Sequence, residues 1–180
     1  MQIRFNPIDP AAEAAELVAF LCRNEWPFHG SARLDEVAVR HRIAAGHYWN
    51  SDREAFWIEA PERIGYLALE DLADLADGGN PVFDLRLAEQ YRGRGLAVPI
   101  LRALAGQVFE RFPSVRRLEG QTREDNLAMR KAFRKAGFLK EAHYRQAWPT
   151  GDGGYLASVA YGLLRGDFET GTVSSFDWAD

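Results

Sequence analysis

Apolar and polar residues recur along the chain with two different periodicities, and these predict its secondary structure. Alternation of apolar and polar residues, or short apolar runs, predicts strands over residues 2–6, 54–60, 64–72, 82–87, 118–122, 138–148 and 155–164. Apolar residues at helical spacing predict helices from Asp9 to about Arg23, over 34–45, from Leu96 to Phe112 and from Leu127 to Ala136. The resulting order, β-α-α-β-β-β-α-β-α-β-β, predicts an α/β domain. Hairpins between the strands over 54–87 favour antiparallel pairing, and the helix from Leu96 favours a parallel crossover.

The composition is that of an ordinary globular domain. The chain has 180 residues, of which 47% are hydrophobic and 27% are charged, so one domain with a substantial core is expected. Its net charge of −4 argues against nucleic acid as a partner and favours an amine-bearing substrate. The single cysteine, Cys22, cannot form an internal disulfide. No signal segment and no membrane-spanning run is evident, so the expectation is a cytoplasmic protein without membrane attachment.

A glycine-rich turn separates the strand at 82–87 from the helix that begins at Leu96. It reads Gln90-Tyr91-Arg92-Gly93-Arg94-Gly95-Leu96-Ala97. Glycines let backbone amides approach a ligand closely, and a helix N-terminus adds free N–H donors with a partial positive charge. Arginines add full charges and forked donors. The turn therefore predicts a phosphate-binding site, and the alternative is a basic turn without a ligand. Its glycine spacing differs from the G-x-G-x-x-G of dinucleotide-binding proteins.

A second motif follows the strand at 118–122. It places Asp125-Asn126 before the helix from Leu127 to Ala136, and Gly137-Phe138 after it. Thr122 or Asp125 could cap this helix, and Gly137 suits the left-handed residue past its end. The two motifs, in this order, resemble the GNAT superfamily of N-acetyltransferases. The closing segment over 161–165 resembles the RimJ/RimL group of that superfamily.

This resemblance covers roughly residues 2–165 and carries several implications. It implies a single acetyltransferase domain over residues 1–165, followed by a C-terminal tail over 166–180. It implies a mixed, twisted central sheet of about seven strands with about four helices on its two faces, and acetyl-CoA as the acyl donor. No histidine has the spacing of a metal ligand, so no metal is expected. The cofactor contacts that the resemblance implies are Leu85, Arg86, Leu87, Arg92, Gly93, Arg94, Gly95, Leu96, Ala97, Asn126 and Phe133.

Direct transfer of an acetyl group requires a neutral amine. A lysine-type amine, with a pKa of ~10.4, needs a strong general base, whereas an α-amino group, at ~7.7–8.0, needs only a weak one. The catalytic candidates are Asp84, Glu119 and Gln121. Gln121 stands where several members of the superfamily carry a glutamate, and Glu119 shares its strand face, although a solvated or salt-bridged role is more typical of such a strand residue. Many relatives supply a tyrosine as proton donor where this chain has Phe133, which cannot donate.

The aromatic loop Trp26-Pro27-Phe28-His29 supplies the substrate-binding candidates. Trp26, Phe28 and His29 lie where members of this superfamily commonly shape the acceptor pocket. A histidine ordinarily titrates near pH 6.5, which suits a general base. The alternative is that Trp26 and Phe28 only anchor the loop to the core, with His29 incidental.

These observations predict an N-acetyltransferase that moves acetyl from acetyl-CoA to a primary amine of a small molecule or a peptide N-terminus. The alternative is a catalytically silent acyl-CoA-binding module, because Phe133 and Gln121 replace residues that act in catalysis in many relatives. A nucleotide-binding protein without CoA chemistry is the third hypothesis. The exposed last strands, with the aromatic Phe168, Phe176 and Trp178 of the tail, would also suit a homodimer.

Overall fold

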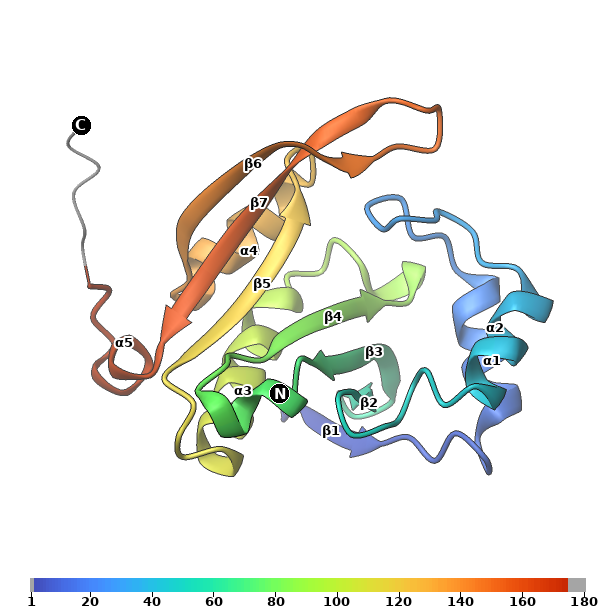
Figure 1. Ribbon diagram of the computed structural model, residues 1–180, viewed down its shortest axis with the longest axis horizontal. Helices are drawn as coiled ribbons and strands as arrows, with labels where there is room; N and C mark the ends of the chain where they lie inside the picture. Colours follow the sequence, from blue (N-terminus) through green and yellow to red (C-terminus); the bar gives the residue numbers. More distant parts are fainter. Residues whose placement is uncertain (1, 175–180) are drawn as a thin grey trace.

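The computed structural model describes residues 2–174, in which a seven-stranded mixed sheet is flanked by five α-helices (Figure 1). The strand order is β1-β2-β3-β4-β5-β7-β6. The strands are β1 (Arg4–Pro7), β2 (Glu54–Glu59), β3 (Arg63–Glu70), β4 (Val82–Leu87), β5 (Arg117–Arg123), β6 (Leu139–Pro149) and β7 (Tyr155–Leu164). The helices are α1 (Ala14–Arg23), α2 (Glu36–Ala44), α3 (Ala97–Arg111), α4 (Leu127–Ala136) and α5 (Arg165–Thr170), with 3₁₀ turns η1 (Ala73–Asp77) and η2 (Glu89–Tyr91). The α/β class, the mixed sheet and the order of the predicted elements are confirmed.

The sheet opens between its two central strands. Strands β2, β3 and β4 pair as consecutive antiparallel hairpins, as predicted. Strands β4 and β5 are parallel neighbours, but they pair only at Val82 and Glu119. Figure 1 shows the two strands diverging beyond this point. The divergence leaves a gap in the middle of the sheet, and the functional site lies beside it.

Each face of the sheet carries its own hydrophobic core. On one face, α3 and α4 pack through Leu104, Val108 and Phe133. On the other face, α1 and α2 pack around Trp57 and Tyr66. Because successive strand residues point to opposite faces, helices on both sides bury almost every position of β2 and β3.

Some helix starts and caps differ in detail from the predicted ones. Asp9 caps a turn rather than a helix, since its carboxylate accepts hydrogen bonds from the next residues and α1 begins only at Ala14. Helix α3 begins at Ala97, so Pro99 is its third residue, where no intrahelical N–H bond is required. Asn126 caps α4, in place of Thr122 or Asp125, because its side-chain oxygen accepts from the Met129 amide at 3.2 Å. The predicted left-handed Gly137 is confirmed, with φ of 102°.

The start of the predicted polar tail is a helix. Arg165 donates three hydrogen bonds of 2.8–3.0 Å to backbone carbonyls between Phe109 and Val115, and the Phe168 ring lies 5.5 Å from that of Phe109. A six-residue helix is too short to produce a periodic pattern in the sequence. Phe176 and Trp178 lie outside the described residues. Among residues 2–174, no helix combines the length and the apolar composition needed to cross a bilayer.

Candidate active site

A cavity of about 450 Å³ lies beside the gap between β4 and β5. Four segments that are distant in sequence form its walls: the loop between α1 and α2, strand β4, the glycine-rich turn with the start of α3, and one side of α4. The lining residues are Trp26–His29, Leu85–Leu87, Tyr91–Gly93, Gly95–Val98, Asn126, Ala128, Met129, Lys131, Ala132 and Lys135. The volume is within the range of sites for small ligands and cofactors.

The glycine-rich turn presents free backbone donors to this cavity. Gly93 and Gly95 adopt φ of 71° and 77°, a left-handed conformation that favours glycine. Within residues 2–174, no acceptor is found for the amides from Gly93 to Val98. The first turn of α3 adds a partial positive charge at the same place. The free backbone donors that the sequence predicts at this turn are therefore present in the structure.

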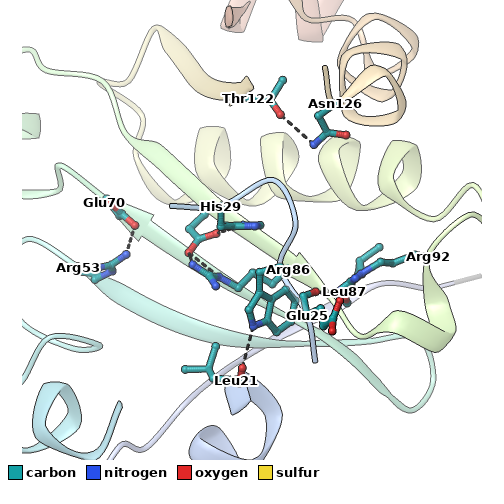
Figure 2. A network of polar contacts seen from close by, with 12 residues as sticks. Leu21, Glu25, His29, Arg53, Glu70, Arg86, Leu87, Arg92, Thr122 and Asn126 are labelled. Carbon is teal, nitrogen blue, oxygen red and sulfur yellow. Dashed lines mark hydrogen bonds and ion pairs between the residues drawn. The ribbon is translucent and has the colours of Figure 1, made fainter. Parts of the chain in front are cut away.

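Helix α4 forms the opposite wall. Asn126 lies there with its amide nitrogen 3.0 Å from the Thr122 hydroxyl, and Figure 2 shows this pair across from His29. Lys131 and Lys135, one turn apart on α4, line the same wall and are exposed. Only the structure shows that these two lysines line the cavity.

Trp26 anchors the loop between α1 and α2 beneath the cavity. Its side chain is 1% exposed, and its indole nitrogen donates to the Leu21 carbonyl at 2.8 Å. The guanidinium carbons of Arg86 and Arg92 lie 5.2 and 5.0 Å from its ring centre. Phe28, two residues further on, has Arg123 of β5 over its ring at 5.2 Å. The loop therefore extends from the β4 side of the gap to the β5 side.

His29 and Asp84 form a hydrogen-bonded pair between the loop that joins α1 to α2 and strand β4. His29 Nε2 lies 3.1 Å from Asp84 Oδ1, while Arg86 donates from Nε to Asp84 Oδ2 at 2.9 Å. Figure 2 shows His29 close to Arg86. The three side chains are 15–26% exposed, so the pairs are partly desolvated.

The ionisation of Asp84 fixes the tautomer of its partner. Burial would raise the pKa of the Asp84 carboxyl, but the hydrogen bond from His29 and the charge of Arg86 outweigh burial and hold that pKa well below its ordinary value. A carboxylate can only accept, so Nε2 of His29 carries a proton. In a neutral imidazole Nδ1 then has the free lone pair, and Nδ1 has no partner within the described residues.

Further unpartnered polar atoms lie near this pair. Tyr66, opposite Arg86 in the β3–β4 pairing, is 1% exposed, and its hydroxyl has no partner within residues 2–174. Burial raises the pKa of the Tyr66 phenol, so it stays protonated and can donate. Nη1 of Arg86 is likewise buried without a partner. No sequence motif indicated Tyr66, because an isolated tyrosine in a buried strand has no distinguishing pattern.

The structure does not bring every predicted site residue to the cavity. Glu119 pairs with Arg117 at 2.7 Å, and Gln121 accepts from the Ser158 hydroxyl at 3.0 Å. Phe133 is fully buried and stacks on Tyr161 with 4.7 Å between ring centres. None of the three lines the cavity, and Asp84 and Arg94 do not line it either. The other predicted residues do: Trp26, Phe28, His29, Leu85, Arg86, Leu87, Arg92, Gly93, Gly95, Leu96, Ala97 and Asn126.

A mixed sheet that parts between two parallel strands, beside a glycine-rich anion cradle, is the architecture expected of an acyl-CoA-dependent transferase. The family model described as "Acetyltransferase (GNAT) domain" matches residues 2–139. The chain belongs to this family of acetyltransferases.

Solved structures of N-acetyltransferases share the fold at low sequence identity. The spermidine N-acetyltransferase of Vibrio cholerae, solved with CoA and spermine, has a TM-score of 0.78 at 14% identity, over 93% of this chain and 98% of that one. The ribosomal protein alpha-N-acetyltransferase RimL, solved with CoA, has a TM-score of 0.72 at 18% identity, over 91% and 94%. Another structure of the Vibrio cholerae enzyme, solved with manganese ions, has a TM-score of 0.73 at 13% identity, over 94% and 96%. Within residues 2–174 of this chain, no group of three or more metal-ligating side chains occurs.

Proposed function

We propose that this acetyltransferase moves acetyl from acetyl-CoA directly to a primary amine of a small molecule or of a peptide N-terminus. The observation that carries the proposal is the cradle of unpartnered amides at Gly93–Val98, at the edge of a cavity that also borders β4. Free N–H groups at a helix N-terminus fit a pyrophosphate. The two neighbouring structures that contain CoA support the choice of cofactor.

Distinct parts of the cavity serve the cofactor and the acceptor. The amides of the turn would hold the pyrophosphate, with Lys131 and Lys135 available for further phosphate oxygens. The backbone of Leu85 lies on the side of β4 that has no strand partner beyond Val82, and it would pair with the pantetheine arm. Leu87 contributes less than its sequence position implies, because its carbonyl already accepts from Arg92 at 2.8 Å. When bound, acetyl-CoA supplies the activated acyl group as a thioester.

His29 is the general base in this proposal, and Asp84 positions it. Asp84 holds Nε2–H, so Nδ1 would take the proton from the attacking amine. The amine nitrogen would bond to the acetyl carbon as the C–S bond breaks, and CoA would leave as its thiolate. Asp84 itself is a poor base, because its carboxylate is held ionised by His29 and Arg86. Nδ1 is shielded from solvent, so the acceptor amine must displace part of its surroundings to reach it. Glu119 and Gln121 have no role in this mechanism, since both are engaged with neighbours away from the cavity.

The test combines cofactor binding with turnover. Calorimetric titration should show selective binding of acetyl-CoA and CoA over ATP, and a panel of α-amino and alkyl amines should reveal turnover. His29→Gln should lower kcat by about 100-fold, in the range of a lost general base, with an unchanged Kd for acetyl-CoA. His41→Gln, at an exposed position of α2, is the matched control and should behave as wild type.

Each outcome separates the hypotheses. Binding of CoA without turnover of any amine would favour the silent acyl-CoA-binding module. Preference for ATP would favour a nucleotide-binding protein. Full activity of His29→Gln would remove His29 from the mechanism and leave the cofactor assignment intact.

A further inference from the structure

The two arginines of the glycine-rich turn have different surroundings. Arg94 is exposed, and its guanidinium lies 5.7 Å from the Tyr91 ring centre. Arg92 is partly buried, and two of its nitrogens are bonded to protein: Nε donates to the Leu87 carbonyl at 2.8 Å, and Nη2 donates to the Glu25 carbonyl at 2.6 Å. The sequence suggests the same phosphate-binding role for both arginines, and the structure gives Arg92 hydrogen-bond partners that Arg94 lacks within residues 2–174.

The segment around Arg92 is joined by several hydrogen bonds to the loop between α1 and α2. The Asn24 side-chain oxygen accepts from the Glu89 amide at 2.9 Å, and the Glu89 carboxylate accepts from the Glu25 amide. The Arg92 bond to the Glu25 carbonyl therefore completes a set of three contacts between residues 24–25 and 89–92. Figure 2 shows Glu25 beside Arg92 and Leu87.

These contacts continue to the His29–Asp84 pair through Trp26. The Trp26 ring lies 5.0 Å from the Arg92 guanidinium carbon and 5.2 Å from that of Arg86, which binds Asp84. The centres of the Trp26 and His29 rings are 6.0 Å apart. Trp26 therefore stands between the turn that would hold the cofactor and the imidazole that would act on the acceptor.

We infer that Arg92 is a positioning residue for acceptor chemistry rather than a phosphate ligand. It fixes the root of the loop at Glu25 and Trp26, and so sets the position of His29 against Asp84. A guanidinium suits this role because its planar fork donates in two directions while its face packs on an aromatic ring. The inference deepens the proposed function and rests on it for the catalytic role of His29.

The test compares Arg92→Gln with Arg94→Gln, two identical substitutions in one turn. Hydrogen exchange, followed by mass spectrometry, should be at least about 10-fold faster for the amides of residues 24–30 in Arg92→Gln and unchanged in Arg94→Gln. The Kd for CoA, measured by calorimetry, should change less than about threefold in Arg92→Gln. With a turned-over amine, kcat/KM for the acceptor should fall about 10-fold or more, while KM for acetyl-CoA stays the same.

Different results overturn different claims. A large loss of CoA affinity in Arg92→Gln, with normal exchange in the loop, would show that Arg92 is a phosphate ligand after all. Faster loop exchange in Arg92→Gln would support the contact between Arg92 and the loop even if the wild-type protein acetylates no amine. That combination would refute the proposed function alone. If Arg92→Gln fails to fold, Trp26→Phe, which keeps an aromatic ring but loses the bond to Leu21, should also speed exchange and lower kcat/KM for the acceptor. Wild-type behaviour of that variant would refute the inference.

Discussion

Gly93 provides the sharpest test of the cofactor site, because it combines a special backbone conformation with an open position at the cavity. Its φ is 71°, and a Cβ added there would meet no atom within 4 Å. Substitution therefore carries a backbone cost but no steric clash. Asparagine and aspartate both tolerate the left-handed conformation better than other side chains, and they are nearly identical in shape. Gly93→Asn thus measures the cost of adding a side chain, and Gly93→Asp adds one negative charge to it.

The magnitude of the charge effect follows from Coulomb's law. A carboxylate about 5 Å from one pyrophosphate charge, at an effective dielectric constant of about 20, is disfavoured by roughly 3 kcal/mol. Counterion screening at physiological ionic strength reduces this to roughly 2 kcal/mol. Since about 1.4 kcal/mol corresponds to a tenfold change in Kd, Gly93→Asp should bind CoA about 30-fold more weakly than Gly93→Asn.

Isothermal titration of CoA into the three proteins measures this difference, after circular dichroism has shown that each is folded. The ratio of the two variants should shrink as salt is raised, because screening weakens the repulsion. Equal affinities for Gly93→Asp and Gly93→Asn at low salt would refute the reasoning, since the pyrophosphate would then lie away from this turn.

Two further predictions concern stability. Arg165→Met should lower the free energy of unfolding in urea by about 2–4 kcal/mol, because three partly buried hydrogen bonds from one charged group are lost. Arg134→Met, at an exposed position of α4, should be nearly neutral, and a similarly small effect for Arg165→Met would mean that Phe168 alone docks α5. For Asp84, the folded pKa is depressed, so its ionic contribution is complete above the ordinary carboxyl pKa of about 4 and is lost as pH falls below it. The stability difference between wild type and Asp84→Asn should accordingly decrease as the pH falls below about 4, and a difference that does not decrease there would show that Asp84 is not ionised in the folded protein.

Local chemistry accounts for what the sequence determined by itself. Gly137 occupies the left-handed position that the sequence predicted for the residue after a helix, because glycine adopts this conformation at little cost. The order of strands and helices followed from apolar periodicity, and the parallel pairing of β4 with β5 followed from the helix between them. The glycine-rich turn and its free backbone donors are local features of one segment, so they could be predicted from the sequence.

The partners of His29, Arg92 and Arg94 are determined only by the tertiary structure. His29 and Asp84 are 55 residues apart, and neither their pairing nor the free lone pair of His29 has a local signal. The separate environments of Arg92 and Arg94 depend on where the loop from Asn24 to Arg33 packs. The positions of Phe133 and Glu119 in the motifs suggested a role in the site. In the structure, however, Phe133 is buried in the core and Glu119 pairs with Arg117. Side-chain partners across a fold are set by packing between distant segments, which no single segment of sequence encodes.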